Sequence, residues 1–228
     1  AEMALPDGTF VHLNAATNLE YDVNNSKQRL VKLSGEAFFD VAKNPDCPFK
    51  VIINDLQIEV VGTSFNVKTY KKDIVETSLL SGRIRISGGS LPHEYTLSPG
   101  QKATYSAMDR TLRISKADAH VEAGWRDNYL IFESTPLIDV IAQIERWYGV
   151  EIRLHHKQIA QDLLSGSFRN ESIQNVIRSL SIQYGFKYEI YKDIIKEAVT
   201  NLSTGAGLSK AFEDKWAFPR IAYEMLVT

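Results

Sequence analysis

Turn signals recur so often in the first half of the chain that no long element can form there. Between residue 5 and about residue 119 they are mostly 8 to 20 residues apart, as glycines, prolines and asparagines. The segments between them are short and rich in β-branched and aromatic residues, for example 38–41, 49–53, 58–61 and 83–86. Such segments favour strands. We predict an antiparallel sandwich, barrel or short solenoid, with no helix longer than two turns between residues 49 and 86.

After Trp125 the hydrophobic period becomes helical. Thr135 and Pro136 are suited to be the N-cap and first residue of a helix that Gly149 ends. Its apolar face would contain Leu137, Val140, Ile141, Ile144 and Tyr148. The same spacing returns before Gly185 in Ile173, Val176, Ile177, Leu180 and Tyr184. With strands at 129–132, 150–154, 163–168 and 186–191, this predicts two strand-helix-strand repeats of about 30 residues, both helices lying on one sheet face.

The two patterns predict a mainly β domain over residues 5–120 and an α+β domain over residues 125–191, joined near 120–124. Limited proteolysis is expected to cut this joint or the tail first. The tail, residues 192–228, is left unassigned. Its segment 198–208 is typical of a loop or linker, and 211–226 could form a helix interrupted by Pro219.

Length and charge exclude several classes of protein. A chain of 228 residues can bury a sizeable core, and its net charge of −2 gives no electrostatic reason to expect nucleic acid. Cys47 is the only cysteine, so an internal disulfide and a CxxC metal site are excluded. No run of 18 apolar residues exists, and residues 1–6 are too short for a signal peptide. We expect this soluble chain to be part of a longer protein.

Ser64 lies in the sequence GTSFN at 62–66, one residue away from the nucleophile elbow G-x-S-x-G. Asn66 replaces the second glycine, and the residues that follow alternate as in a strand, so no helix follows the serine. We interpret Gly62 as a bend or bulge whose neighbouring hydroxyls bond to the backbone. Replacing Ser64 with alanine would then cost about 1 kcal/mol of stability and no activity.

Other candidate catalytic and metal-binding groups are also weak. Glu36 and Asp40 share one face of a strand without a pocket signal, which favours ordinary surface carboxylates. His155 and His156 are adjacent in a strand and point to opposite faces, so they cannot share a metal ion. The remaining histidines are scattered: His12, His93 and His120. We predict no catalytic residue, no metal and no cofactor, so the chain is not expected to be an enzyme.

Six motifs of the first half resemble, in order, those of the FecR family of anti-sigma factors. They are LPDGT at 5–9, LSGEAFFDVA at 33–42, PFKV at 48–51, VGTSFNV at 61–67, LSGRI at 80–84 and LSPGQ at 97–101. In the second half, FESTP at 132–136 and IERWYGVEI at 144–152 resemble the C-terminal domain that accompanies FecR in Bacteroidetes-type proteins. That domain is similar to the short N-terminal domain of secretins and TonB-dependent receptors. The resemblance covers residues 5–191.

The resemblance implies a cell-surface signalling relay. In the family, a cytoplasmic segment binds an extracytoplasmic-function sigma factor and one helix crosses the inner membrane. The periplasmic part receives a signal from an outer-membrane TonB-dependent transporter. This chain resembles only the periplasmic part, so we expect its partner to be the periplasmic signalling domain of such a transporter. Contact with the sigma factor would require a cytoplasmic segment that is absent from these residues.

We place the candidate partner site on the first helix of the second domain. A helical wheel leaves Asp139, Gln143 and Arg146 facing solvent, with Trp147 on the flank. Tryptophan and arginine are frequent interface anchors, because each combines a large area with a directional polar group. The alternative for Trp147 is that it closes the edge of the core.

A carbohydrate-binding β-sandwich is the alternative function. Such a module needs exposed aromatic platforms, and Tyr21, Tyr95 and Tyr105 could provide them. Tyrosines near turns also serve in packing, so exposure of these three rings would separate the two interpretations.

Overall fold

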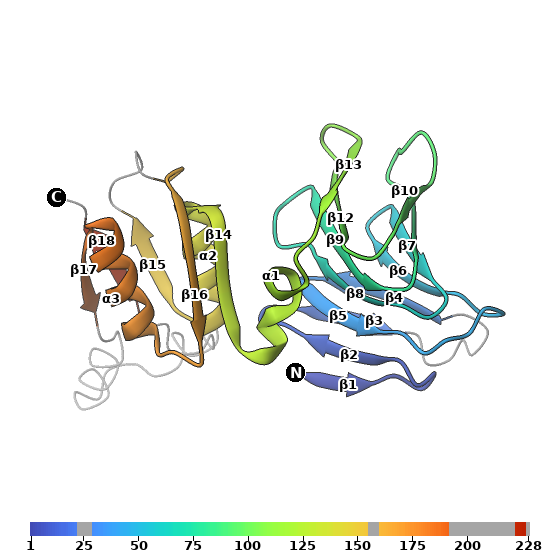
Figure 1. Cartoon of the computed structure of the whole chain (residues 1–228), viewed down its shortest axis with the longest axis horizontal. Coiled ribbons are helices and arrows are strands. Elements are labelled where there is room, and N and C mark those ends of the chain that lie inside the picture. Colours follow the sequence, from blue (N-terminus) through green and yellow to red (C-terminus); the bar gives the residue numbers. More distant parts are fainter. Residues whose placement is uncertain (22–28, 155–159, 192–221, 227–228) are drawn as a thin grey trace, which may run out of the picture. The chain divides into compact units, whose positions relative to one another are not determined.

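The computed structural model describes residues 1–21, 29–154, 160–191 and 222–226. The chain forms two compact units, Ala1–Leu130 and Ile131–Thr228, which we call unit 1 and unit 2 (Figure 1). The predicted fold class, mainly β followed by α+β, is confirmed. The predicted domain boundaries stay a prediction.

Unit 1 contains two sheets that face a common core. Sheet A has seven strands in the order β1-β2-β5-β8-β9-β12-β13, and sheet B has six in the order β11-β10-β7-β6-β4-β3. Their bounds are β1 Glu2–Ala4, β2 Phe10–Leu13, β3 Asn18–Tyr21, β4 Arg29–Ser34, β5 Glu36–Asp40, β6 Phe49–Ile53, β7 Leu56–Val60, β8 Ser64–Lys68, β9 Ile74–Ser81, β10 Ile84–Gly88, β11 Tyr95–Leu97, β12 Gln101–Ser106 and β13 Thr111–Lys116. Residues 49–86 hold only strands and turns, as predicted.

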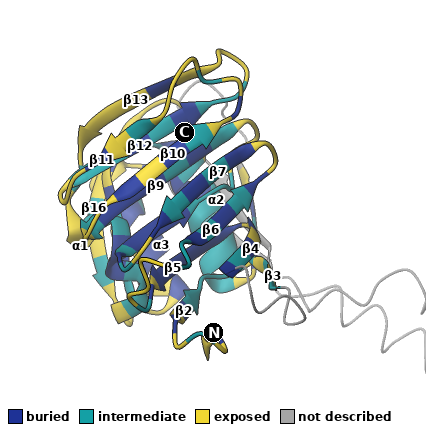
Figure 2. Cartoon of the chain, turned by 90° about the vertical axis from the view of Figure 1, so that its right-hand side faces the viewer, coloured by how far each residue is buried: buried dark blue, intermediate teal, exposed yellow. Residues whose placement is uncertain are grey.

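Alternating side chains build the core of unit 1. In β6 and β7 every second residue is buried, which matches the period of a strand with one face against a core (Figure 2). Phe39 of sheet A meets Phe49 of sheet B with ring centroids 5.9 Å apart, and it stacks on Phe65 at 5.2 Å. Unit 1 is therefore a sandwich, one of the three predicted architectures, and not a barrel or a solenoid.

Local chemistry explains two connections in unit 1. The β6–β7 hairpin turns through Asn54 and Asp55, and Asn54 has φ of 54°, a conformation that asparagine tolerates. Gly62 allows close approach, because a Cβ atom there would lie 2.9 Å from the Cα atom of Lys43. One pairing differs from the antiparallel expectation: β4 and β6 are parallel. A parallel pair needs a crossover, and β5 in the other sheet lies within it.

A short helical segment ends unit 1. It consists of α1 (Ala119–Ala123) and the 3₁₀ helix η1 (Gly124–Asp127). Asp118 is the N-cap of α1, and its carboxylate accepts a bond from the amide of His120 at 2.8 Å. The stretch predicted as a joint is thus helical.

The described residues of unit 2 form two helices and two small sheets. Its elements are β14 Tyr129–Pro136, α2 Leu137–Tyr148, β15 Glu151–Leu154, β16 Leu163–Arg169, α3 Ile173–Tyr184, β17 Lys187–Tyr191 and β18 Ala222–Leu226. The sheets have the orders β14-β16 and β15-β18-β17. The expectation of one sheet with both helices on its face is wrong, because α2 contacts β15 of one sheet and β16 of the other.

The helical period is confirmed in both helices. Their buried residues are Leu137, Val140, Ile141 and Ile144 in α2, and Ile173, Val176, Ile177 and Leu180 in α3. Gly149 and Gly185 end the helices in the left-handed conformation, as predicted. The last residues of the two apolar faces, Tyr148 and Tyr184, are only partly buried. The hydroxyl of Tyr148 bonds to the backbone of Glu171, and that of Tyr184 bonds to the backbone of Ser165.

The predicted N-cap of α2 is wrong. Pro136 occupies that position, with no side-chain cap, while the hydroxyl of Thr135 bonds to the backbone of Glu133. The amide of Leu137 donates to the carbonyl of Asp162 at 2.9 Å, and the amide of Ile138 donates to that of Ala160 at 3.0 Å. Because backbone carbonyls already satisfy these first amides, a capping side chain is unnecessary.

The described part of the tail is a strand and not the end of a helix. β18 pairs in parallel with β15 and antiparallel with β17, so it is the middle strand of its sheet. The predicted loop at 198–208 and the helical prediction for 211–221 lie outside the described residues.

Candidate functional site

A buried polar cluster lies on the face of sheet A opposite the core. The carboxylate of Glu36, only 6% exposed, accepts bonds from the side-chain amides of Asn14 at 2.7 Å and Asn66 at 2.9 Å. The carbonyl oxygen of Asn66 accepts a bond from the indole nitrogen of Trp125 at 3.2 Å. The interpretation of Glu36 as a surface carboxylate is therefore wrong. Glu36 therefore joins β5 to β8 and to Asn14, and Asn66 extends the cluster to Trp125 of η1.

The segment α1–η1 covers this cluster through three side chains. Besides the bond of Trp125, the guanidinium of Arg126 lies 3.6 Å from the ring centroid of Phe38. Lys102 of β12 lies 2.7 Å from a carboxylate oxygen of Glu122 and 3.4 Å from one of Glu76. Burial of the Lys102 ammonium opposes its charge, but the two carboxylates outweigh burial and raise the pKa of Lys102 above its usual value.

A second buried cluster surrounds Arg29, which is 5% exposed. Its guanidinium lies 3.1 Å from the carboxylate of Asp7. It also donates to three backbone carbonyls, those of Cys47 at 2.6 Å, Ala42 at 2.7 Å and Asn44 at 3.2 Å. Asp7 in turn accepts bonds from the amide and hydroxyl of Thr9. Arg29 therefore ties the turn before β2 to the loop between β5 and β6.

Ser64 is the first residue of β8, and the carboxylate of Asp40 lies beside its hydroxyl. Its hydroxyl donates to the carboxylate of Asp40 at 2.7 Å in an exposed position, while the neighbouring Thr63 makes the bonds to the backbone, at Arg83. A register irregularity between Ser64 and Phe65 in the pairing with β9 agrees with the predicted bulge. The predicted backbone bonds thus belong to Thr63 and not to Ser64.

The expected cost of Ser64→Ala therefore falls. Because an exposed hydroxyl–carboxylate bond competes with water, we expect a loss of at most about 0.5 kcal/mol in the free energy of unfolding. Thr63→Ala, the matched control, is expected to lose about 1–2 kcal/mol, because Thr63 is only 3% exposed. Urea unfolding of both variants would check this order. The reverse order would show that the Ser64 bond matters for the fold.

The described histidines pack against aromatic rings. His12 packs edge-on against Phe10 and Phe38, His93 stacks on Tyr95, and His120 packs against Tyr129. Among the residues that the structure describes, no three His, Cys, Asp or Glu side chains are grouped to hold a metal ion. His155 and His156 lie outside the described residues.

The exposed-platform interpretation fails for Tyr105. This ring is 3% exposed, and its hydroxyl donates to the carbonyl of Gly89. Burial, reinforced by the charge of Asp55, raises the pKa of Tyr105. Tyr21 and Tyr95 are half-buried and pack against the core of the sandwich. The carbohydrate-binding alternative therefore loses Tyr105 as a platform.

The predicted partner site lies along α2. Asp139, Gln143, Arg146 and Trp147 are all half-buried, so none is as open as the helical wheel suggested. The most exposed side chain of α2 is instead Ile138, at 45%. The carboxylate of Glu145 accepts a bond from the amide of Ile152 at 2.7 Å, which ties α2 to β15. The four residues remain a candidate strip on one helix.

Sequence reasoning missed Arg29, Asn66 and Trp125 as organising residues. Asn66 was noticed only as the residue that replaces a glycine. A buried arginine carries no local signal, since its partners are 13 to 22 residues away in the chain. Asn66 and Glu36 do lie within motifs that supported the family resemblance, and this was the one available signal for them.

Together, the sandwich and the α+β unit define a β-rich protein of two units, in which buried polar clusters tie the strands of the sandwich together. Residues 1–85 match the FecR protein family model, and residues 129–196 match the model of the FecR C-terminal domain. The chain belongs to the FecR family of anti-sigma factors, which confirms the family predicted from the motifs. Members of this family are membrane-anchored regulators and are not typically enzymes.

Solved structures agree with this assignment. Two crystal structures of a proposed anti-sigma factor from Parabacteroides distasonis ATCC 8503, at 1.65 Å and 2.50 Å resolution, are similar to this chain. Each is 26% identical, with a TM-score of 0.79, and the match covers 100% of this chain and 94% of the other. A search of curated proteins gave no match. In the part of the chain that the structure describes, no helix has the length and apolar character needed to cross a membrane.

Proposed function

We propose that this chain is the periplasmic signalling portion of a transmembrane anti-sigma factor. It would relay the state of an outer-membrane TonB-dependent transporter to an extracytoplasmic-function sigma factor. The observation that carries the proposal is the pair of family matches, FecR over residues 1–85 and its C-terminal domain over residues 129–196. The sigma factor itself would be contacted through a cytoplasmic segment outside these residues.

The transporter would meet unit 2 on the α2 strip, which consists of Asp139, Gln143, Arg146 and Trp147. The opposite face of α2 is buried, so this strip is the side on which the helix can present polar and aromatic groups. Arg146 and Trp147 are the two residues there with the chemistry of interface anchors. Both side chains are half-buried, so their rotamers are already restricted. They therefore lose less conformational entropy when a partner binds.

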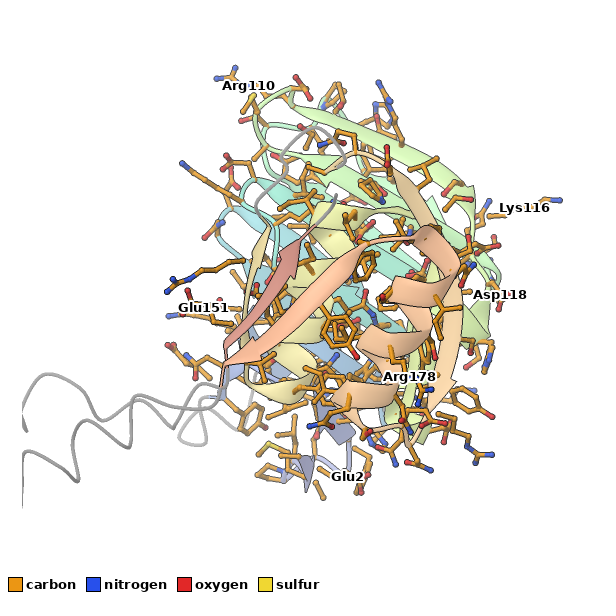
Figure 3. All side chains as sticks on the ribbon, turned by 90° about the vertical axis from the view of Figure 1, so that its left-hand side faces the viewer. Glu2, Arg110, Lys116, Asp118, Glu151 and Arg178 are labelled. Carbon is orange, nitrogen blue, oxygen red and sulfur yellow. The ribbon has the colours of Figure 1, made fainter. Side chains whose placement is uncertain are left out.

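Arg146→Ala is expected to weaken binding of the transporter's periplasmic signalling domain by at least about 1 kcal/mol, because a charged, partly desolvated contact is lost. Calorimetric titration of the purified chain with the signalling domain encoded beside it would measure this. Arg178→Ala is a matched control, because Arg178 lies exposed on α3 in the same unit (Figure 3). Equal affinities of wild type, Arg146→Ala and a folded Trp147→Phe variant would remove α2 from the interface.

A further inference from the structure

Among the described residues, no strand pairs with the second edge of β16 in unit 2. β16 belongs to a sheet of two strands, and within the described residues it pairs only with β14. A strand with a free edge presents backbone N–H and C=O groups that can pair with an added strand. Natural proteins usually block such an edge with lysine, proline or a bulge. The sequence of β16, LLSGSFR, contains neither lysine nor proline.

Of the side chains that the structure describes, that of Tyr184 bonds to this edge. The hydroxyl of Tyr184, at the end of α3, accepts a bond from the backbone amide of Ser165 at 2.8 Å, and it donates to the carbonyl of the same residue at 3.3 Å. The phenol therefore meets the donor and the acceptor that a neighbouring strand would meet. Tyr184 is 37% exposed, so its ring can leave this position without opening the core.

The surroundings indicate what kind of strand fits. Leu163 stands two residues before Ser165, on the same side of β16, and 60% of its surface is exposed. An apolar side chain of an added strand would cover it. Neither β16 nor α3 contains an acidic residue, and Arg169 ends β16. An occupant with a carboxylate would match this charge.

We propose that the β16 edge is a strand-addition site, where an extended, acid-bearing segment of the transporter's signalling domain replaces the Tyr184 hydroxyl. This inference rests on the proposed function, which supplies the partner. Without the partner, the Tyr184 hydroxyl would occupy the backbone N–H and C=O groups of Ser165. The added strand would displace it. The α2 strip would contact other parts of the same partner.

Two substitutions test the edge in opposite directions. Tyr184→Phe keeps the ring but removes the competing hydroxyl, so the signalling domain is expected to bind about 3- to 10-fold more tightly. Ser165→Pro removes the N–H group that an added strand would use, and binding is expected to weaken at least about tenfold. Tyr148→Phe is the control for the first change, because its hydroxyl bonds to the carbonyl of Glu171 and not to β16. If Ser165→Pro does not fold, Leu163→Ser replaces it, with an expected loss of about fivefold.

The whole chain is titrated calorimetrically with the signalling domain and, separately, with a peptide that copies β14 (YLIFESTP). The two titrations distinguish failure of the edge proposal from failure of the proposed function. If the domain binds but Tyr184→Phe and Ser165→Pro stay within twofold of wild type, the edge proposal is overturned and the proposed function stands. If the domain does not bind but the peptide does, more tightly to Tyr184→Phe, the edge stands and the transporter partner fails. If neither binds, both are overturned.

Discussion

Arg29→Ala is expected to destabilise unit 1 by about 3–5 kcal/mol, because it breaks a buried ion pair and leaves one partner without its countercharge. The side chain of Asp7 is only 12% exposed, so its carboxylate would lose the guanidinium without gaining full hydration. The carbonyls of Ala42, Asn44 and Cys47 would lose a charged donor at the same time. The cost therefore comes from groups left behind more than from the arginine itself.

Urea unfolding followed by the fluorescence of Trp125 would measure this loss in unit 1, in a background with Trp147→Phe and Trp216→Phe. Arg29→Lys is expected to recover only part of the stability, since an ammonium cannot reproduce the planar set of donors. Lys32→Ala is the control: its ion pair with Glu20 is 66% and 63% exposed, and its loss should cost at most about 0.5 kcal/mol. Similar losses for Arg29→Ala and Lys32→Ala would contradict a structural role for the Arg29 cluster.

Asn66→Ala is expected to cost about 2–4 kcal/mol, the sum of one bond to a charged group and one neutral bond, each lost in a buried place. Asn66 is 2% exposed and stands between the carboxylate of Glu36 and the indole of Trp125. Its replacement leaves an acceptor and a donor without the amide that joined them.

A double-mutant cycle with Trp125→Phe would isolate the amide–indole bond. We expect a coupling energy of about 0.5–1.5 kcal/mol between the two sites. Denaturant-dependent hydrogen exchange of the β5 and β8 amides reports the opening of unit 1 and needs no tryptophan. Asn18→Ala, at an exposed position of β3, serves as the control. Strictly additive effects at Asn66 and Trp125 would show that the bond contributes nothing to stability.

The sequence predicted what depends on local pattern. The period of two in β6 and β7 and the period of 3.6 in α2 each place apolar groups on one side, and the buried residues follow both. Gly149 and Gly185 also ended their helices where expected, because the left-handed conformation is itself a local requirement.

Features that depend on residues far away in the sequence were not predicted. The amides at the start of α2 bond to carbonyls near residue 160, so the tertiary structure replaced the side-chain cap that Thr135 was expected to supply. The parallel pairing of β4 with β6 also requires knowledge of where the intervening strand goes. At the candidate site, the residue types on α2 were predictable, but their half-burial was not, because it depends on how the strands around the helix are arranged.

The position of β18 has a consequence for the covalent integrity of the chain. Its pairing with β15 and β17 is intramolecular only because residues 192–221 link it to β17. Cleavage of one peptide bond in that link would turn the pairing into a bimolecular equilibrium, and dilution would then release the strand. The edges of β15 and β17 that pair with β18 would then be open.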